Sequence, residues 1–386
     1  MSCRLVVITE IIAPYRIPVF NALALQSGID LHVIFLAETD PTQRQWLVYK
    51  DEIQFAFQVL PSWRQRIHGH HLLLNWGMNA ALQRLSPDVI VCGGYNYLAS
   101  WEALRWAHCN AVPFLLWVES TARDFRSGAT LLESLKTKFL RHCQGFVVAG
   151  TSASHYINSY DMSATPIFTA PNAVDIRFFA KAAEKARRNA SRNRQQLNLP
   201  DRYFLFVGRL ERGKGIFDLL DAYASLPTEL RSQLGLVFVG DGSARSQLQK
   251  RAAAVKPDSI HIAGFLQREQ LAIFYALAET FVFPTHTDPW GLVVNEAMSC
   301  GLPVVCSNAA GCAADLVTNR HNGRLFAAGD ISQLACFLGE LARSPEIRSS
   351  MGQASKLRIQ DYSPEACAAG MAKATFAFIQ PQHACS

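Results

Sequence analysis

The chain has 386 residues, 49% of them hydrophobic, and a formal net charge of +6. This length suits two domains of ordinary size, and the apolar content is enough to fill two cores. No run of eighteen or more apolar residues occurs, which excludes an ordinary transmembrane helix. The modest positive charge comes without a recognisable nucleic-acid-binding module, so we expect no nucleic-acid partner.

The N-terminal segment and the cysteines both indicate a protein that stays in the cytoplasm. Residues 1–12, MSCRLVVITEII, lack a small-residue cleavage site and are typical of a first buried strand rather than a signal peptide. None of the ten cysteines forms a C-x-x-C pair, which argues against a structural zinc site. A disulfide framework is not expected in a chain with cores of this size.

The first half of the chain alternates apolar strand patterns with helical patterns, which is typical of a doubly wound α/β domain. Strands are expected at Arg4–Ile8, Leu31–Leu36, Asp88–Gly94, Pro113–Val118 and Gly145–Ala149, and helices at Val19–Gln26, Leu98–His108 and Leu131–Cys143. This half closes at Ala170–Asp175, and we place the domain boundary near Asp175.

The loop after the first strand, Thr9–Pro18, holds Tyr15 and Arg16 between two prolines. Ligands of open α/β sheets bind at the carboxyl ends of the strands, so both side chains are candidate ligand contacts. An equally good interpretation is that Tyr15 packs against the protein and Arg16 pairs with a surface acid.

Basic residues gather in three other places. These are the stretch Lys181–Arg194, the stretch Arg64–His68, and the group Lys136, Lys138, Arg141 and His142. Attraction to an anionic membrane surface is one interpretation, and a solvated charged face is the other. The stretch Lys181–Leu199 is predicted to be a helix that joins the two halves and ends at Pro200.

The second half has the same alternation of elements. Strands are expected at Tyr203–Val207, Gly235–Val239, Ile260–Ala263, Thr280–Phe283 and Val304–Ser307, and helices at Gln270–Ala278, Val293–Cys300 and Glu365–Phe378. Residues Asn322–Phe326 are predicted to form a hairpin-like return. The tail Gln380–Ser386 is expected to be frayed.

A glycine-rich loop, GRLERGKG, follows the strand Tyr203–Val207 and runs from Gly208 to Gly215. Glycines at a strand-to-helix turn let the backbone approach an anion, and Arg209 and Lys214 supply positive charge. The order G-x-x-x-x-G-K-[ST] of a Walker loop is absent. Three glycines can also mark no more than a turn.

The most informative stretch is Phe281–Val317, which is predicted to be a βαβ unit with Asp288 in its first loop. Gly291 precedes the helix and would let an anion approach the unpaired N–H groups of its first turn. Glu296 lies early in that helix, where a carboxylate accepts hydrogen bonds from sugar hydroxyls. By spacing alone, a cap and a solvated helix residue are an equally good interpretation of the two acids.

Residues 284–305 fit the pattern P-[ST]-x-x-[ED]-x-[FW]-G-x-x-x-x-E-A-M-x-x-G-x-P-V-V. The fixed positions are occupied by Pro284, Thr285, Asp288, Trp290, Gly291, Glu296, Ala297, Met298, Gly301, Pro303, Val304 and Val305. This pattern resembles the donor-site signature of the family-four retaining glycosyltransferases of the GT-B fold, of the bacterial cell-surface polysaccharide and lipopolysaccharide type. Segment Gly208–Gly215 is similar to the G-R-L-x-x-x-K-G of that family, and Pro171–Asp175 to its P-N-G-V-D segment.

The resemblance implies a role for each candidate residue. Arg209 and Lys214 would bind the donor diphosphate beside Gly208, with backbone contacts from Gly291, Leu292 and Val293. Glu296 would hold the ribose. Asp288, which replaces the usual glutamate, would contact the sugar. Phe265 and Leu266 would lie against the base, and Tyr15 and Arg16 would meet the acceptor. Many relatives have a histidine where this chain has Glu119. The Glu119 carboxylate would orient the acceptor hydroxyl, balance the positive charge that develops at the anomeric carbon, or only cap the next segment.

The resemblance also implies two Rossmann-like domains facing across a cleft. Residues 1–175 would bind the acceptor, 176–361 the nucleotide sugar, and 362–386 would form a terminal helix that crosses back to the first domain and ends in the tail. The expected reaction is metal-independent, retaining transfer of a sugar from a nucleotide diphosphate to an acceptor hydroxyl, on a glycan or lipid-linked acceptor at the inner face of the cytoplasmic membrane.

Two other functions fit the same sequence. One is a sugar-nucleotide epimerase or a phosphorylase on the same fold. The other is a non-catalytic nucleotide-sugar-binding protein, which the aspartate at position 288 and the missing histidine make conceivable. Isomerised sugar nucleotide or sugar phosphate would identify the first, and donor binding without turnover would identify the second.

Overall fold

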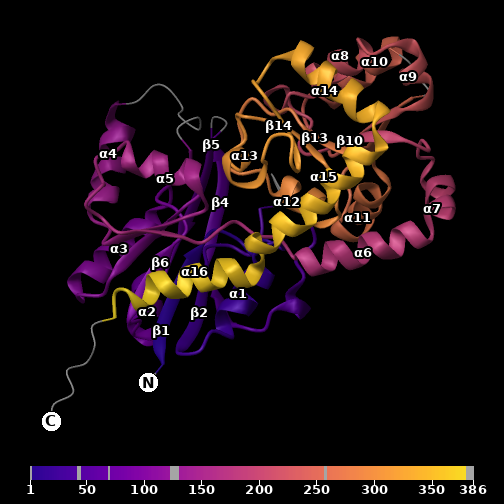
Figure 1. Ribbon diagram of the computed structural model, residues 1–386. Helices are drawn as coiled ribbons and strands as arrows, with labels where there is room; N and C mark the ends of the chain where they lie inside the picture. Colours follow the sequence, from indigo (N-terminus) through magenta and orange to yellow (C-terminus); the bar gives the residue numbers. More distant parts are fainter. Residues whose placement is uncertain (1, 41–44, 68–69, 122–129, 256–258, 380–386) are drawn as a thin grey trace. The chain divides into compact units, whose positions relative to one another are not determined.

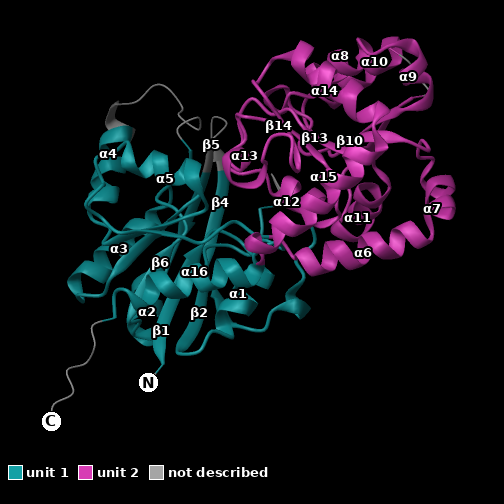
Figure 2. Ribbon diagram, in the orientation of Figure 1, with its two compact units in different colours: residues 1–173, 364–386 teal, residues 174–363 magenta. Residues whose placement is uncertain are grey.

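The structure is a computed structural model that describes residues 2–40, 45–67, 70–121, 130–255 and 259–379. The chain forms two compact units, which are coloured separately in Figure 2. Unit 1 comprises Met1–Ala173 with Pro364–Ser386, and unit 2 comprises Val174–Ser363. Each unit is a parallel sheet flanked by helices, which confirms the predicted α/β, doubly wound fold class (Figure 1).

Seven parallel strands form the sheet of unit 1 in the order β3-β2-β1-β6-β7-β8-β9. Their bounds are β1 Cys3–Thr9, β2 Ile29–Phe35, β3 Ala56–Val59, β6 Val89–Cys92, β7 Phe114–Val118, β8 Gly145–Val148 and β9 Ile167–Thr169. The central strands are apolar at every position, VIVC in β6 and FLLWV in β7, because both faces of a parallel sheet are covered.

Helices cover both faces of this sheet. They are α1 Ile17–Ala24, α2 Met78–Leu85, α3 Leu98–Cys109, α4 Thr130–Arg141, α5 Thr151–Asn158 and α16 Pro364–Phe376, and Lys50–Glu52 forms the 3₁₀ turn η1. Side chains of β6 alternate between two cores. Ile90 shares one core with α2, α3, α4 and α5, and its neighbour Val91 shares the other with α1 and α16.

The C-terminal helix α16 is part of unit 1, where it packs against α1 and β9. Gly370 allows this approach, because a Cβ at that position would lie 2.3 Å from the carbonyl oxygen of Thr169. The tail Gln380–Ser386, predicted to be frayed, lies outside the described residues.

An antiparallel hairpin, β4 Ser62–Ile67 with β5 His70–Asn75, follows β3 and is absent from the sequence prediction. Its strands carry arginine, glutamine and histidine at positions where the period-two pattern of a half-buried strand calls for apolar residues. Alternating hydrophobicity therefore does not predict these two strands. The side chains of Arg66, Ile67 and His68, part of the predicted basic stretch, lie outside the described residues.

Unit 2 has six parallel strands in the order β12-β11-β10-β13-β14-β15. Their bounds are β10 Tyr203–Val207, β11 Gly235–Val239, β12 Ile260–Gly264, β13 Thr280–Phe283, β14 Val304–Ser307 and β15 Gly323–Phe326. The prediction of a hairpin-like return at Asn322–Phe326 was wrong. This segment is a parallel strand beside β14, because the intervening chain with α13 crosses over before it enters the sheet.

The helices of unit 2 complete two layers around this sheet. They are α6 Ile176–Arg188, α7 Ala190–Leu197, α8 Ile216–Ala224, α9 Thr228–Gln233, α10 Arg245–Val255, α11 Arg268–Leu277, α12 Leu292–Ser299, α13 Ala313–Leu316, α14 Ile331–Arg343 and α15 Pro345–Arg358, with 3₁₀ turns η3 Arg212–Lys214 and η4 Ile359–Tyr362. One core joins the sheet to α8, α10 and α14, and α6 packs against α11 and α12.

The predicted helix Lys181–Leu199 is two helices, α6 and α7, which meet at Asn189. The first begins earlier than predicted, because the Asp175 carboxylate accepts a hydrogen bond from the Phe178 N–H at 2.8 Å and caps it. The backbone of Asn189 leaves the helical region at φ −113° and ψ 28°, which ends α6 there.

Candidate functional site

The carboxyl edge of the unit 2 sheet brings together the loops that carry most of the candidate residues. The loop Gly208–Gly215 follows β10, and the loop Pro284–Gly291 follows β13. These strands are adjacent, and β10 pairs on its other side with β11, so the order of the strands reverses here. Ligands of open α/β sheets bind at such a switch point.

Lys214 and Asp288, predicted independently from the two loops, form an ion pair. The Lys214 Nζ lies 2.7 Å from Asp288 Oδ2 and donates a second hydrogen bond to the Thr287 carbonyl oxygen at 3.0 Å. The other carboxylate oxygen of Asp288 accepts from the Trp290 N–H at 3.1 Å. Both side chains are mostly buried, so the ammonium group is held in one place at the sheet edge.

Two glycines let the backbone of these loops pack closely. Gly215, at φ +69°, precedes α8, and a Cβ there would lie 1.9 Å from the Pro284 carbonyl oxygen. Gly291, at φ +97°, precedes α12, and a Cβ there would lie 2.6 Å from a ring carbon of Phe283. Both positions favour glycine on conformation and on space.

The N-terminus of α12 carries the predicted backbone contacts Leu292 and Val293. Among the described residues no side chain caps this end, where Gly291 is the N-cap. The N–H groups of a helix's first turn point outward and carry partial positive charge, which suits an anion. The helix begins four residues beyond Asp288, at the same sheet edge as the Lys214 ammonium group.

Arg209 lies apart from this ion pair. Its side chain is more than half exposed and pairs with Glu211 at 3.0 Å. The preceding Gly208 donates from its N–H to the Val239 carbonyl oxygen at 3.0 Å, which ties the start of the loop to β11. A diphosphate contact from Arg209 would therefore require its side chain to leave Glu211.

Phe265 and Leu266 follow the edge strand β12, two strands from β10 in the sheet order. The Phe265 ring is 38% exposed, which is unusual for a core phenylalanine, and Leu266 is half-buried. The Gly240 N–H donates to the Gly264 carbonyl oxygen at 2.8 Å, so this turn is joined to the loop after β11. A flat apolar ligand group could rest on the exposed ring.

Glu296 lies in α12 and accepts a hydrogen bond from the Tyr275 hydroxyl at 2.7 Å. Burial raises the pKa of Glu296 to about 7, and this hydrogen bond lowers it in part. Sequence analysis did not single out Tyr275, because it is one apolar-face residue of α11 among many. The sequence offers one indication of its role, which is that a tyrosine on the apolar face of a helix needs a hydrogen-bond partner for its hydroxyl group.

In unit 1, the predicted residues Arg16 and Glu119 form an ion pair with Nη2 and Oε2 2.8 Å apart. Arg16 also donates to the Thr9 hydroxyl at 3.0 Å, and its guanidinium lies 4.2 Å from the centre of the Trp117 ring. Burial opposes the charge of Arg16, but Glu119 and Tyr15 raise its pKa overall. Sequence analysis missed Thr9 and Trp117.

Tyr15 packs its ring edge-on against Trp46, with the ring centres 6.0 Å apart. Arg16 therefore pairs with an acid and Tyr15 packs, as the structural interpretation of the loop expected. The acid is Glu119, at the carboxyl end of β7, rather than an unrelated surface residue. Both candidate groups thus lie at the edge of the sheet where ligands of this fold bind.

Replacement of Arg16 by methionine should destabilise the protein by about 1–3 kcal/mol, since it leaves the half-buried Glu119 carboxylate without its cation. Glu119→Gln should cost less, because its amide oxygen still accepts from Arg16. Urea unfolding measures both changes. Equal losses within about 0.5 kcal/mol would show that the ion pair contributes nothing measurable.

One side chain in each of two predicted basic groups is paired with an acid within unit 1. Arg64 pairs with Asp40 and, at 3.3 Å, with Glu10. Lys136 is buried, pairs with Glu133 at 3.4 Å and is hydrogen-bonded to the Tyr160 hydroxyl. These two side chains therefore support the fold rather than a charged surface.

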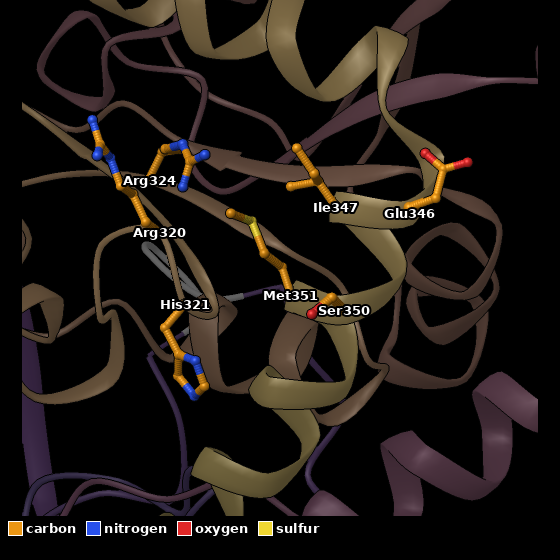
Figure 3. Close-up of a pocket in the computed structure, with 7 residues that line it drawn as sticks. All are labelled: Arg320, His321, Arg324, Glu346, Ile347, Ser350 and Met351. Carbon is orange, nitrogen blue, oxygen red and sulfur yellow. The ribbon is translucent and has the colours of Figure 1, made fainter.

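A hollow of about 330 Å³ lies at the opposite edge of the unit 2 sheet (Figure 3). It is lined by Arg320, His321, Arg324, Glu346, Ile347, Ser350 and Met351. Arg320 and His321 lie two to three residues before the first residue of β15, at the amino ends of the strands. Arg324 is buried and paired with Glu340 at 2.5 Å. This hollow is distinct from the site around Lys214.

No set of three or more His, Cys, Asp or Glu side chains within the described ranges is placed to hold a metal ion. The nine cysteines among those residues are free thiols. None of the described helices combines the length and the apolar character that crossing a membrane requires.

Comparison with known proteins shows similarity to glycosyltransferases. Residues 187–358 match the family model of glycosyl transferases group 1. The chain is 40% identical over 110 residues to O-antigen chain mannosyltransferase B of Escherichia coli, a match that covers 28% of each chain. It is 28% identical over 226 residues to D-inositol 3-phosphate glycosyltransferase of Corynebacterium jeikeium, covering 56% of this chain and 53% of that one.

Among solved structures, HepE of Anabaena in complex with UDP superposes with a TM-score of 0.75, at 18% identity over 98% of this chain and 100% of that one. The chain thus has the GT-B fold of its structural neighbours. Residues 187–358, the part that matches the family model, include both loops of the site, Gly208–Gly215 and Pro284–Gly291. Its matches span about a quarter and about half the length of the two curated relatives.

Proposed function

We propose that the protein transfers a sugar, with retention at the anomeric carbon, from a nucleotide-diphosphate sugar to an acceptor hydroxyl. The observation that carries this proposal is the arrangement of Lys214, Asp288, the N-terminus of α12 and Glu296 at one sheet edge, inside residues 187–358. A cation and an uncapped helix end suit a diphosphate, and the half-buried carboxylate of Glu296 suits hydroxyl groups.

The proposed reaction depends on stabilising the leaving nucleoside diphosphate. Lys214 would do so, with Arg209 joining after it leaves Glu211 and with backbone N–H groups of Leu292 and Val293. Such preorganised donors can lower the barrier by several kcal/mol. Because these groups balance the charge, we propose that no metal ion is required. Asp288 would contact the sugar, Glu296 the ribose, and Phe265 and Leu266 the base.

We propose that unit 1 binds the acceptor, with Glu119 oriented by Arg16 and with Tyr15 beside them. Similarity to an O-antigen chain mannosyltransferase supports a cell-surface polysaccharide or lipopolysaccharide pathway. The acceptor in such a pathway would be a glycan or a lipid-linked glycan. The protein would then work in the cytoplasm, at the inner face of the membrane.

A thermal-shift screen against UDP-, GDP-, dTDP- and ADP-sugars tests the donor site. A ligand at a hundred times its Kd stabilises the native state by about 2.7 kcal/mol, which corresponds to a rise of about 5–10 °C in Tm for units of this size. We expect such a shift with one nucleotide class, unchanged by EDTA. No shift with any of the four would refute the donor site.

The same donor then tests the reaction itself. Incubated with glycan and lipid-linked acceptors, the protein should release the nucleoside diphosphate and form a glycoside with the donor's anomeric configuration, as read by NMR coupling constants. An inverted product would refute retention. Isomerised sugar nucleotide, or binding without turnover on any acceptor, would refute transfer in favour of an epimerase or a binding protein.

A further inference from the structure

We propose that Tyr275 is a positioning residue, which holds the Glu296 carboxylate so that it discriminates ribose from deoxyribose in the donor nucleotide. This inference rests on the proposed function, because it assumes that Glu296 meets the ribose. It adds a specificity-determining residue from α11, outside the two loops that carry the site.

The geometry around Tyr275 fixes its hydroxyl group in one position. The side chain is fully buried, and its ring packs edge-on against Phe179 of α6 and Phe281 of β13, with centre distances of 6.1 and 5.7 Å. The hydroxyl lies 2.7 Å from Glu296 Oε2 and 3.3 Å from the Val293 carbonyl oxygen. It therefore joins α11 to the first turns of α12.

This hydrogen bond restricts the carboxylate to one orientation. With Oε2 held by Tyr275, Oε1 accepts no hydrogen bond from the described residues and remains available to a ligand. A carboxylate has about four lone-pair sites, so it can serve Tyr275 and two vicinal hydroxyl groups together. A buried acceptor left unpaired is costly, so a ligand that lacks one hydroxyl should bind less well.

Burial, rather than neighbouring charges, brings the pKa of Glu296 near neutrality. Burial raises the pKa of Tyr275 well above its usual value, so the phenol stays a donor. Cys300, the C-cap of the same helix, also has its pKa raised by burial and stays neutral. The positive charges of Arg187 in α6 and Lys356 in α15 act against this rise in the pKa of Cys300. The Glu296 pKa of about 7 then decides how much of the site is ionised.

The sign of the expected pH effect follows from this. The ionised carboxylate accepts from both ribose hydroxyls, so nucleotide binding should strengthen as pH rises through about 7. The Tyr275 hydroxyl favours the ionised form, and its removal raises the pKa of Glu296 further. Tyr275→Phe should therefore weaken binding most near pH 7 and recover at pH 9.

The experiment is calorimetric titration of the full chain with UDP, GDP and ADP, and with the 2′-deoxy and 3′-deoxy forms of whichever binds, between pH 6 and 9. The wild type should prefer the ribonucleotide by about 10-fold or more. Tyr275→Phe should lose most of the preference for the ribonucleotide over its deoxy forms at pH 7, and it should show the wild-type preference again at pH 9. Glu296→Gln should lack it at every pH.

Tyr203→Phe is the matched control, because Tyr203 is also fully buried in unit 2 and its hydroxyl donates to a carbonyl oxygen, that of Phe274, at 2.7 Å. It should bind as the wild type does. A Tyr275→Phe defect that is equal at pH 7 and 9, or no defect at all, would overturn the positioning role. Binding of dTDP in place of these three would overturn the ribose preference, and failure of all four to bind the wild type would instead refute the donor site itself.

Discussion

Lys214→Ala should lower kcat/KM for sugar transfer by about 100- to 1,000-fold, the usual loss when one preorganised donor to a developing negative charge is removed. Lys214 supplies the one ammonium group of the Gly208–Gly215 loop, and Asp288 and the Thr287 carbonyl oxygen hold it at the sheet edge. Donor binding should weaken as well, since the diphosphate is already charged in the ground state. Steady-state kinetics and the thermal-shift assay measure the two effects.

Two variants separate the charge of Lys214 from its structural role. Lys214→Met removes the ammonium group but keeps most of the aliphatic stem, and it should be as inactive as Lys214→Ala. Lys214→Arg keeps the charge and should retain more activity than either. Should Lys214→Ala fold normally and retain activity within about threefold of the wild type, the proposed diphosphate contact would be wrong.

Gly215→Ala should destabilise the protein by about 3 kcal/mol or more and abolish donor binding. A left-handed conformation costs an alanine about 1–2 kcal/mol. In addition, its Cβ would lie 1.9 Å from the Pro284 carbonyl oxygen, so the backbone after β13 would have to move. For units of this size, we therefore expect the Tm of Gly215→Ala to be lower than that of the wild type by about 6–12 °C.

Gly213→Ala is the control for this substitution. It lies two residues away in the same loop, and a Cβ there would meet no atom within 4 Å. It should change neither Tm nor donor binding measurably. If both variants were equally stable and bound the donor equally well, the close approach of the two loops would not be needed for the site.

The sequence was sufficient for those elements whose own residues determine their structure. The strand Val304–Ser307 and the strand Tyr203–Val207 were predicted within the bounds observed, because strands buried on both faces are continuous apolar runs. The sequence was insufficient for segments whose structure depends on contacts with residues elsewhere in the chain. The strand Gly323–Phe326 was taken for part of a hairpin, since short-range turn signals say nothing about which strand it pairs with.

The candidate site shows the same division. Lys214, Asp288, Gly291 and Glu296 could be named from two motifs, because the spacing of charges and glycines at strand ends is a local property. That Arg209 pairs with Glu211 could not be predicted, because a long exposed side chain chooses its partner by the local surface. Tyr275 was missed because its contact with Glu296 spans two elements.

By itself, then, the amino-acid sequence determined the class of fold and the loops in which the candidate residues lie, because hydrophobic periodicity and glycine positions act over a few residues. Only the tertiary structure decided that Lys214 binds Asp288 and that the acid paired with Arg16 is Glu119. These contacts join residues far apart in the chain, and they form only where the packing of whole sheets and helices brings them together.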